Sequence, residues 1–201
     1  MTPRLEPLPK ERWDEDARTA LQGFVGAEMA ERFLSDDPDA PRIPNVVGTL
    51  MHHPRLAGRW LAYSNVLLRK PALEPRWREL VVLRVAWWTR SEYEWVQHVR
   101  MAAGCGISND EVEAIADGAG AGGWSPLEAD LLTATDQLLD RYRIDDETWA
   151  RLAAHLDERQ LVEVVFVVGS YACLAMAFNS FGLELDPELL PIRDTAPPLP
   201  A

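Results

Sequence analysis

Hydrophobic side chains recur along most of the chain at the three- and four-residue spacing of one helix face. The clearest example is the apolar stripe Leu127, Leu131, Ala134, Leu138 and Tyr142, which is separated by polar positions. No segment shows the alternation of apolar and polar residues that is typical of strands. The pattern therefore predicts an all-α fold of about seven or eight helices.

Two of the predicted helices, residues 76–89 and 158–181, are apolar on nearly every face. Such helices form a buried layer, and part of that surface could be covered by another subunit. Residues 161–178 could be mistaken for a membrane span, but they are slightly short and contain Glu163, Ser170 and Tyr171. We therefore expect a buried core helix and no membrane partner.

Proline-rich stretches divide the chain. We predict an N-terminal arm and helix over residues 1–44, a helical domain over 45–185 and a proline-rich tail over 186–201. The arm could be a lid over a pocket or a plain surface strap, and the sequence leaves both interpretations open.

Cap signals mark several predicted helix starts. Proline is favoured in the first turn, so Pro54 and Pro126 indicate caps at His53 and Ser125. Ser91 and Glu94 have the S-x-x-E spacing of a capping box, and Ser108 is predicted to cap the next helix in the same way.

Charge and cysteine content narrow the function classes. The formal net charge of −12 repels phosphate backbones, so no nucleic-acid partner is expected. The two cysteines, Cys105 and Cys173, are far apart and no C-x-x-C occurs, which fits a reducing compartment. The first residues, MTPRLEPLPKERW, lack the apolar core of a signal peptide, and we predict a cytoplasmic protein.

Three titratable residues form the strongest candidate site. Glu94 and His98 are four residues apart and share a helix face, while Glu79 lies in the preceding apolar helix. A tight turn near Arg90 would make these helices antiparallel and bring Glu79 to within about one turn of the level of His98. A histidine and carboxylates in an apolar pocket are suited to proton transfer.

Structural explanations of the same residues stay open. Glu94 could complete the capping box or pair with Arg90 or Arg100, and Glu79 could pair with Arg76 or Arg84. One histidine with two carboxylates could bind a metal, but H-E-x-x-H is absent, and we predict no metal and no cofactor. Further candidates, predicted to contact a small-molecule substrate, are Ser91, Trp95, His53 and Tyr171.

Around these residues the sequence resembles a known family. REL-(x)3-R-(x)6-SEYEWVQHV, followed by a G-I-S-x-x-E-V helix and WSPLEADLLTATDQL, is similar to the carboxymuconolactone decarboxylase family, relatives of alkylhydroperoxidase D. The resemblance covers roughly residues 45–185. It implies an all-α fold and a homo-oligomer, as a dimer, trimer or hexamer.

The resemblance also implies roles for the candidate residues. The peroxidase branch carries a glutamate followed by C-x-x-C-x-x-x-H; here Glu79 and His98 match, whereas Ser91 and Glu94 occupy the cysteine positions. Peroxide reduction needs a thiolate and a resolving thiol, so this departure argues against peroxidase chemistry. Implied instead is cofactor-free acid–base chemistry, with His98 as general acid or electrostatic partner, Glu79 as proton relay and Glu94 as second acid–base group.

Three functional hypotheses follow. The first is a lyase or isomerase acting on a small carboxylate or lactone. The second is a thiol peroxidase that uses Cys105. The third is a non-catalytic helical oligomer that binds a small ligand. A permanent pairing of Glu79 with Arg76 or Arg84 would favour the third hypothesis, and an open cavity the first.

Overall fold

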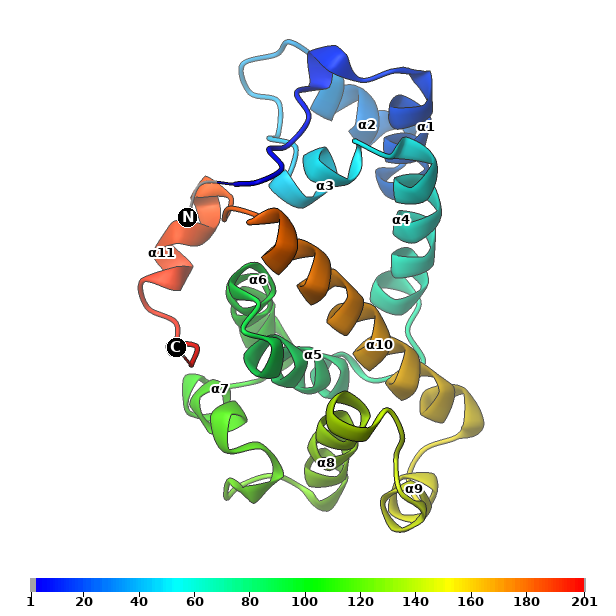
Figure 1. Ribbon diagram of the computed structural model, residues 1–201, viewed down its shortest axis with the longest axis vertical. Coiled ribbons are helices and arrows are strands. Elements are labelled where there is room, and N and C mark those ends of the chain that lie inside the picture. Colours follow the sequence, from blue (N-terminus) through cyan, green and yellow to red (C-terminus); the bar gives the residue numbers. More distant parts are fainter. Residues whose placement is uncertain (1–2, 201) are drawn as a thin grey trace. The chain divides into compact units, whose positions relative to one another are not determined.

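The computed structural model describes residues 3–200, and within that range every regular element is a helix (Figure 1). The α-helices are α1 (Glu15–Val25), α2 (Ala27–Leu34), α3 (Asn45–Leu50), α4 (Pro54–Arg69), α5 (Pro75–Thr89), α6 (Glu92–Ala102), α7 (Asn109–Ala114), α8 (Pro126–Arg141), α9 (Asp146–Ala153), α10 (Glu158–Phe181) and α11 (Leu190–Arg193). Four short 3-10 helices are η1 (Lys10–Arg12), η2 (Ala103–Cys105), η3 (Ile115–Gly120) and η4 (Pro187–Leu189). The all-α prediction is confirmed.

The helix count is slightly above the predicted seven or eight, since the described residues contain eleven α-helices. α11 has only four residues, which is too short to show helical periodicity. Gly26, at φ 88°, also ends α1 and begins α2 within one predicted helix. That positive φ is a conformation that glycine adopts without steric cost.

The chain forms two compact units. The first runs to Lys70 and takes in Ser180–Asp186; the second comprises Pro71–Asn179 and resumes at Pro187. The predicted boundary at residue 185 lies next to Pro187, where the chain returns to the second unit, whereas no unit boundary falls at residue 44.

The first unit packs α1 against α4 around Trp13, Leu21, Met51 and Leu61, all buried. Its N-terminal arm lies against α3, where the Leu8 amide donates to the Gly48 carbonyl at 3.0 Å. A Cβ at Gly48 would lie 2.9 Å from the Cβ of Pro7, so only glycine allows this close approach.

A segment from the far end of the sequence completes the first unit. Buried Asp186 accepts a hydrogen bond from the Asn45 amide at 2.8 Å and an ion pair from Arg42 at 3.0 Å. The Arg4 amide donates to the Phe181 carbonyl at 2.7 Å. This unit is therefore built from both ends of the chain.

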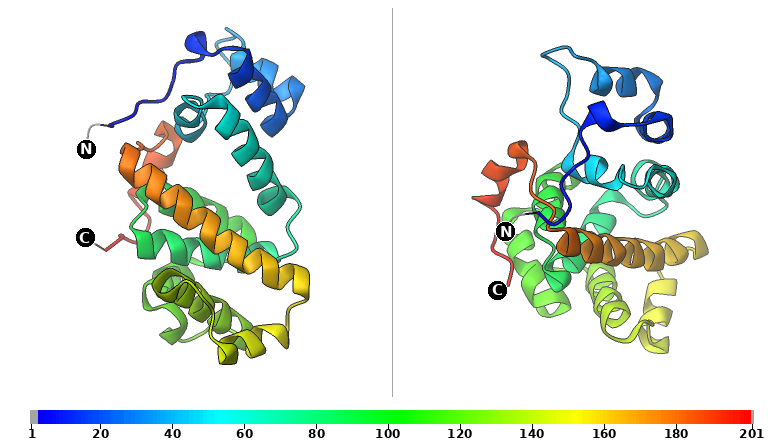
Figure 2. Two further views of the ribbon diagram at one scale, coloured as in Figure 1. Left: turned by 45° about the vertical axis from the view of Figure 1, so that its right-hand side comes forward. Right: turned by 45° about the horizontal axis from the view of Figure 1, so that its top comes forward.

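In the second unit, α5 packs against α6 and α8, and α10 runs beside α6 (Figures 1 and 2). Ring contacts join α6 to α10, because Tyr93 meets Phe178 edge-on with centroids 5.4 Å apart. Nine residues of α5 are buried, as its all-round apolar pattern predicts.

α10 is long and apolar enough to cross a membrane by length and composition, but half of its most apolar window is buried in the protein. Its inward face includes Val164, Val167 and Ala175, which have no exposed surface, so α10 is a core helix of the second unit. Its outward face leaves Val162, Phe166 and other apolar side chains exposed.

Candidate functional site

The turn between α5 and α6 positions the candidate residues. Arg90 ends α5 in the left-handed conformation at φ 56°, and the Ser91 amide donates back to the Ala86 carbonyl at 3.0 Å. The chain therefore reverses within two residues, as the sequence predicts. Glu79 on α5 then lies opposite His98 on α6.

Glu79 has no exposed surface and is held on both carboxylate oxygens. Its Oε1 accepts from Arg78 Nη2 at 2.8 Å and Nε at 3.1 Å, and its Oε2 lies 2.6 Å from His98 Nδ1. Burial opposes the charged form, but His98 and then Arg78 hold the pKa of Glu79 below its usual value. Glu79 is thus an ionised carboxylate between two cationic or donor groups.

Glu94 has the opposite environment. It is 2% exposed, and neither carboxylate oxygen has a hydrogen-bond partner. Burial raises the pKa of Glu94 to about 8; the nearby Ser91 hydroxyl opposes the shift without forming a hydrogen bond of ordinary geometry. At neutral pH Glu94 is a protonated carboxylic acid.

The predicted structural roles of Glu94 are wrong. Ser91 precedes α6 without a side-chain capping bond, and its buried hydroxyl has no partner. Because the carboxyl of Glu94 is also unpartnered, neither a capping box nor a pair with Arg90 or Arg100 forms. The same spacing does give complete capping boxes at Ser108 and Ser125.

Tyr171 brings α10 to the same group of residues. Its ring meets His98 edge-on, with centroids 5.0 Å apart. Burial, followed by the charges of Glu79 and Glu94, raises the pKa of Tyr171 above its usual range, so the phenol stays neutral. Since both carboxyls act on this phenol, Tyr171 lies near both.

Trp95 and His53 have other contacts. The buried indole of Trp95 donates to the Pro197 carbonyl at 2.8 Å, so the C-terminal tail contacts α6 beside Glu94. His53 lies in the first unit and caps α4, where its Nδ1 accepts from the Leu56 amide at 3.4 Å. The cap is confirmed, whereas substrate binding by either residue stays a prediction.

The arginine partners predicted for Glu79 are wrong. Arg76 and Arg84 instead bind α8, through Glu128 at 2.6 Å and Asp136 at 2.6 Å respectively. The partner in the structure is the adjacent Arg78, which is itself buried. Neighbouring positions on a helix do not normally face each other, so no spacing rule indicated it.

Cys105 lies in η2, directly after α6. Burial and then the charge of Glu79 raise the pKa of the Cys105 thiol, with Arg78 opposing. A raised pKa reduces the thiolate fraction that attacks peroxides. Both cysteines are free, and Cys173 is exposed on α10.

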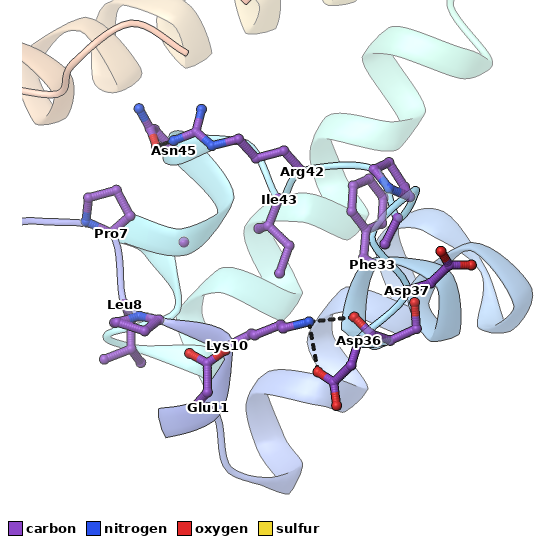
Figure 3. Close-up of a pocket in the computed structure, with 15 residues that line it drawn as sticks. Pro7, Leu8, Lys10, Glu11, Phe33, Asp36, Asp37, Arg42, Ile43 and Asn45 are labelled. Carbon is purple, nitrogen blue, oxygen red and sulfur yellow. Dashed lines mark hydrogen bonds and ion pairs between the residues drawn. The ribbon is translucent and has the colours of Figure 1, made fainter. Parts of the chain in front are cut away.

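The first unit contains an open cavity of about 530 Å³ (Figure 3). Phe33 and Ile43 lie between Lys10 at one side and Arg42 with Asn45 at the other. Lys10 contacts the Asp36 carboxylate at 3.4 Å, and Arg42 contacts Asp186. None of the sequence-predicted site residues lines this cavity, and its two cations already have partners.

Among residues 3–200, no three His, Cys, Asp or Glu side chains are grouped as a metal would require. The candidate active site is therefore the buried cluster of Arg78, Glu79, Ser91, Glu94, His98 and Tyr171, called the α5–α6 cluster below.

Known proteins share this fold. Residues 54–137 match the carboxymuconolactone decarboxylase family. No curated protein matches the chain in sequence. The solved structures that resemble it include an uncharacterized peroxidase-related protein from Ralstonia eutropha with an alkylhydroperoxidase AhpD core, at TM-score 0.72 and 16% identity over 92% of this chain and 94% of that one.

Two other solved structures are similar at low identity. One is an uncharacterized peroxidase-related protein from a Silicibacter species, at TM-score 0.72 and 14% identity over 94% of this chain and 95% of that one. The other is a debrominase in complex with 2,3,4-tribromopyrrole, at TM-score 0.70 and 12% identity over 97% of this chain and 98% of that one. At these identities the likeness shows the fold alone.

Proposed function

Because residues 54–137 match the carboxymuconolactone decarboxylase family and the fold is alkylhydroperoxidase D-like, we propose that the chain is a cofactor-free lyase or isomerase acting on a small carboxylate or lactone. The observation that carries the proposal is Glu94, a buried carboxyl that is protonated at neutral pH and bound to nothing. Glu94 shares a helix face with His98, and His98 in turn contacts the ionised carboxylate of Glu79.

The proton-transfer roles follow from the contacts. Glu79 binds Nδ1 of His98, so Nε2 is the ring nitrogen left to exchange a proton with a substrate. Glu94 carries a proton that it can donate. Arg78 is a positioning residue, because it fixes the carboxylate of Glu79 that orients His98.

These roles suit a reaction through an enolate. When a carbon–carboxylate or carbon–hydrogen bond beside a carbonyl breaks, its electron pair moves into an enolate. The displaced group leaves as carbon dioxide in the first case, and as a proton accepted by His98 in the second. Glu94 hydrogen-bonds to the enolate oxygen through its proton. His98 then delivers a proton to the substrate carbon, which is the one it accepted in the second case and one taken up from solvent in the first.

The two other hypotheses fit less well. A thiol peroxidase needs a reactive thiolate, whereas Cys105 has a raised pKa and Ser91 and Glu94 occupy the positions of the redox cysteines. A purely structural cluster explains Glu79, which is fully paired. It does not explain a buried Glu94 without any partner, which is costly unless a ligand binds there.

We also propose a homo-oligomer that forms through the outward face of α10. Val162, Phe166 and Met176 are more than half exposed on this face. Between them, a Cβ on Gly169 would meet nothing within 4 Å apart from the neighbouring backbone of its own helix, so a second helix could approach closely. Phe166→Glu should lower the mass measured by light scattering to that of a monomer; an unchanged mass would contradict this interface.

Deuterium exchange tests the proposed chemistry. In deuterium oxide at pH 7, the protein should accelerate exchange of the acidic hydrogens of levulinate or cyclohexenone, measured by proton NMR. His98→Gln should reduce the acceleration on the order of 10²-fold, because it removes one acid–base group. Glu92→Gln is the matched control, since Glu92 is exposed on the same helix. No acceleration with either compound, or full activity in His98→Gln, would overturn the proposal.

A further inference from the structure

The α5–α6 cluster contains two buried polar groups without partners. The Ser91 hydroxyl and both carboxylate oxygens of Glu94 lack hydrogen bonds, although each residue is at most 2% exposed. They are three residues apart at the start of α6 and so lie on one face of the helix. Folded proteins rarely leave such groups unpaired, and an explanation by capping fails here.

We propose that Ser91 and Glu94 bind the carbonyl oxygen of an uncharged substrate, such as a lactone, ester or enone, in preference to a carboxylate. This inference rests on the proposed acid–base function and narrows its substrate class. Two hydroxyl donors one turn apart match the two lone pairs of a carbonyl oxygen.

The charges around the site favour a neutral ligand. Arg78 and His98 are the cationic or ionisable bases described in the cluster, and both contact Glu79. No ion pair reaches Glu94 from any residue between 3 and 200. A ligand carboxylate would therefore add a second buried negative charge beside Glu79, and unpaired buried charges are costly.

The donor character of the site depends on pH. The other titratable groups of the α5–α6 cluster are Arg78 and Glu79 on α5, His98 on the same helix as Glu94, and Tyr171 on α10, whose pKa Glu94 helps to raise. Tyr171 is neutral throughout the neutral range. Glu94 ionises at about pH 8 and then loses its only hydrogen, so it repels a carbonyl oxygen above that pH.

Ligand-observed NMR on the full chain tests the inference with two probes of similar shape, cyclohexenone and cyclohexenecarboxylate. At pH 7 the enone should bind about tenfold or more tightly than the carboxylate, because only the carboxylate brings a buried charge. Above pH 8 its affinity for the wild type should fall by about tenfold per pH unit. In Glu94→Gln, whose amide donates at every pH, the affinity should not change with pH.

Two further variants make the outcome decisive. Ser91→Ala should weaken enone binding by about three- to tenfold, the effect of one neutral hydrogen bond. Glu92→Gln should behave like the wild type. Tighter binding of the carboxylate, or the same pH dependence in Glu94→Gln as in the wild type, would overturn the inference.

The two proposals can fail separately. Enone binding with the expected pH profile but without deuterium exchange would leave recognition intact and remove the catalytic function. Catalysed exchange of levulinate together with preferential carboxylate binding would leave the catalytic function intact and remove the neutral-substrate inference.

Discussion

Two buried carboxyls of the second unit differ in their hydrogen-bond partners. Glu163 on α10 accepts hydrogen bonds from the amides of Ala72 at 2.7 Å and Leu73 at 3.1 Å. Glu94 on α6 is buried to a similar extent and has no partner. The first carboxyl joins a loop to a helix, whereas the second is left with an unused proton. Burial alone therefore does not mark a carboxyl as a candidate for function; the missing hydrogen bonds single out Glu94.

Removing the carboxylate of Glu79 should have the largest effect on stability. Glu79→Ala leaves Arg78 and His98 buried without their anion, which should lower the free energy of unfolding by about 3–5 kcal/mol. Urea unfolding at pH 7 measures the change. A loss below that caused by Glu163→Ala would mean that the ion pairs are weaker than their geometry indicates.

Glu94→Gln should change stability in the opposite direction. The unfolded carboxyl ionises near pH 4.5 and the folded one near pH 8, so the folded state holds one more proton between these values. Wild-type stability should therefore fall by about 1.4 kcal/mol per pH unit over this range relative to the variant. Urea unfolding at pH 5, 6, 7 and 8 should show the free energy of unfolding of the variant rising relative to that of the wild type as the pH increases. Parallel curves would contradict the raised pKa.

Glu163→Ala sharpens the comparison because it removes a fully bonded carboxyl. The amides of Ala72 and Leu73 lose their acceptors, which should cost about 1–3 kcal/mol of stability. Enone affinity measured by NMR should stay at the wild-type value. A loss of affinity in a variant that remains folded would show that Glu163 also supports the site.

Cys105→Ser should have the smallest effect. Unfolding should change within about 0.5 kcal/mol, since the thiol is only partly buried. Deuterium exchange should be unchanged in this variant. A peroxide-reducing activity of the wild type that disappears in Cys105→Ser would instead revive the thiol hypothesis.

Periodicity and cap spacing predicted most of the fold. The apolar pattern gave the all-α class and the buried helices α5 and α10, and the caps at His53, Ser108 and Ser125 form as expected. Ser91 has the same spacing to an acidic residue but forms no cap, because its hydroxyl and the carboxyl of Glu94 are buried instead of bonding to the end of the helix. Spacing does not determine whether a side chain is buried.

Helical geometry also predicted part of the candidate site. The reversal at Arg90 brings Glu79 to His98, as helical geometry requires. The role of Arg78 was not predictable, because residues next to each other on a helix normally point apart and the contact depends on how both side chains bend. The sequence offered Arg76 and Arg84 as partners of Glu79 because all three lie on the same helix. In the structure both arginines pair with carboxylates of α8, a contact that spacing within one helix cannot reveal.

The placement of Asp186 and Glu163 has a consequence for synthesis on the ribosome. Asp186 completes the first unit through Asn45 and Arg42, and Glu163 ties α10 to the opening loop of the second. The contacts of Asp186 and Glu163 therefore form only after residues 163 and 186 have left the exit tunnel, well after the helices that they join have been synthesised.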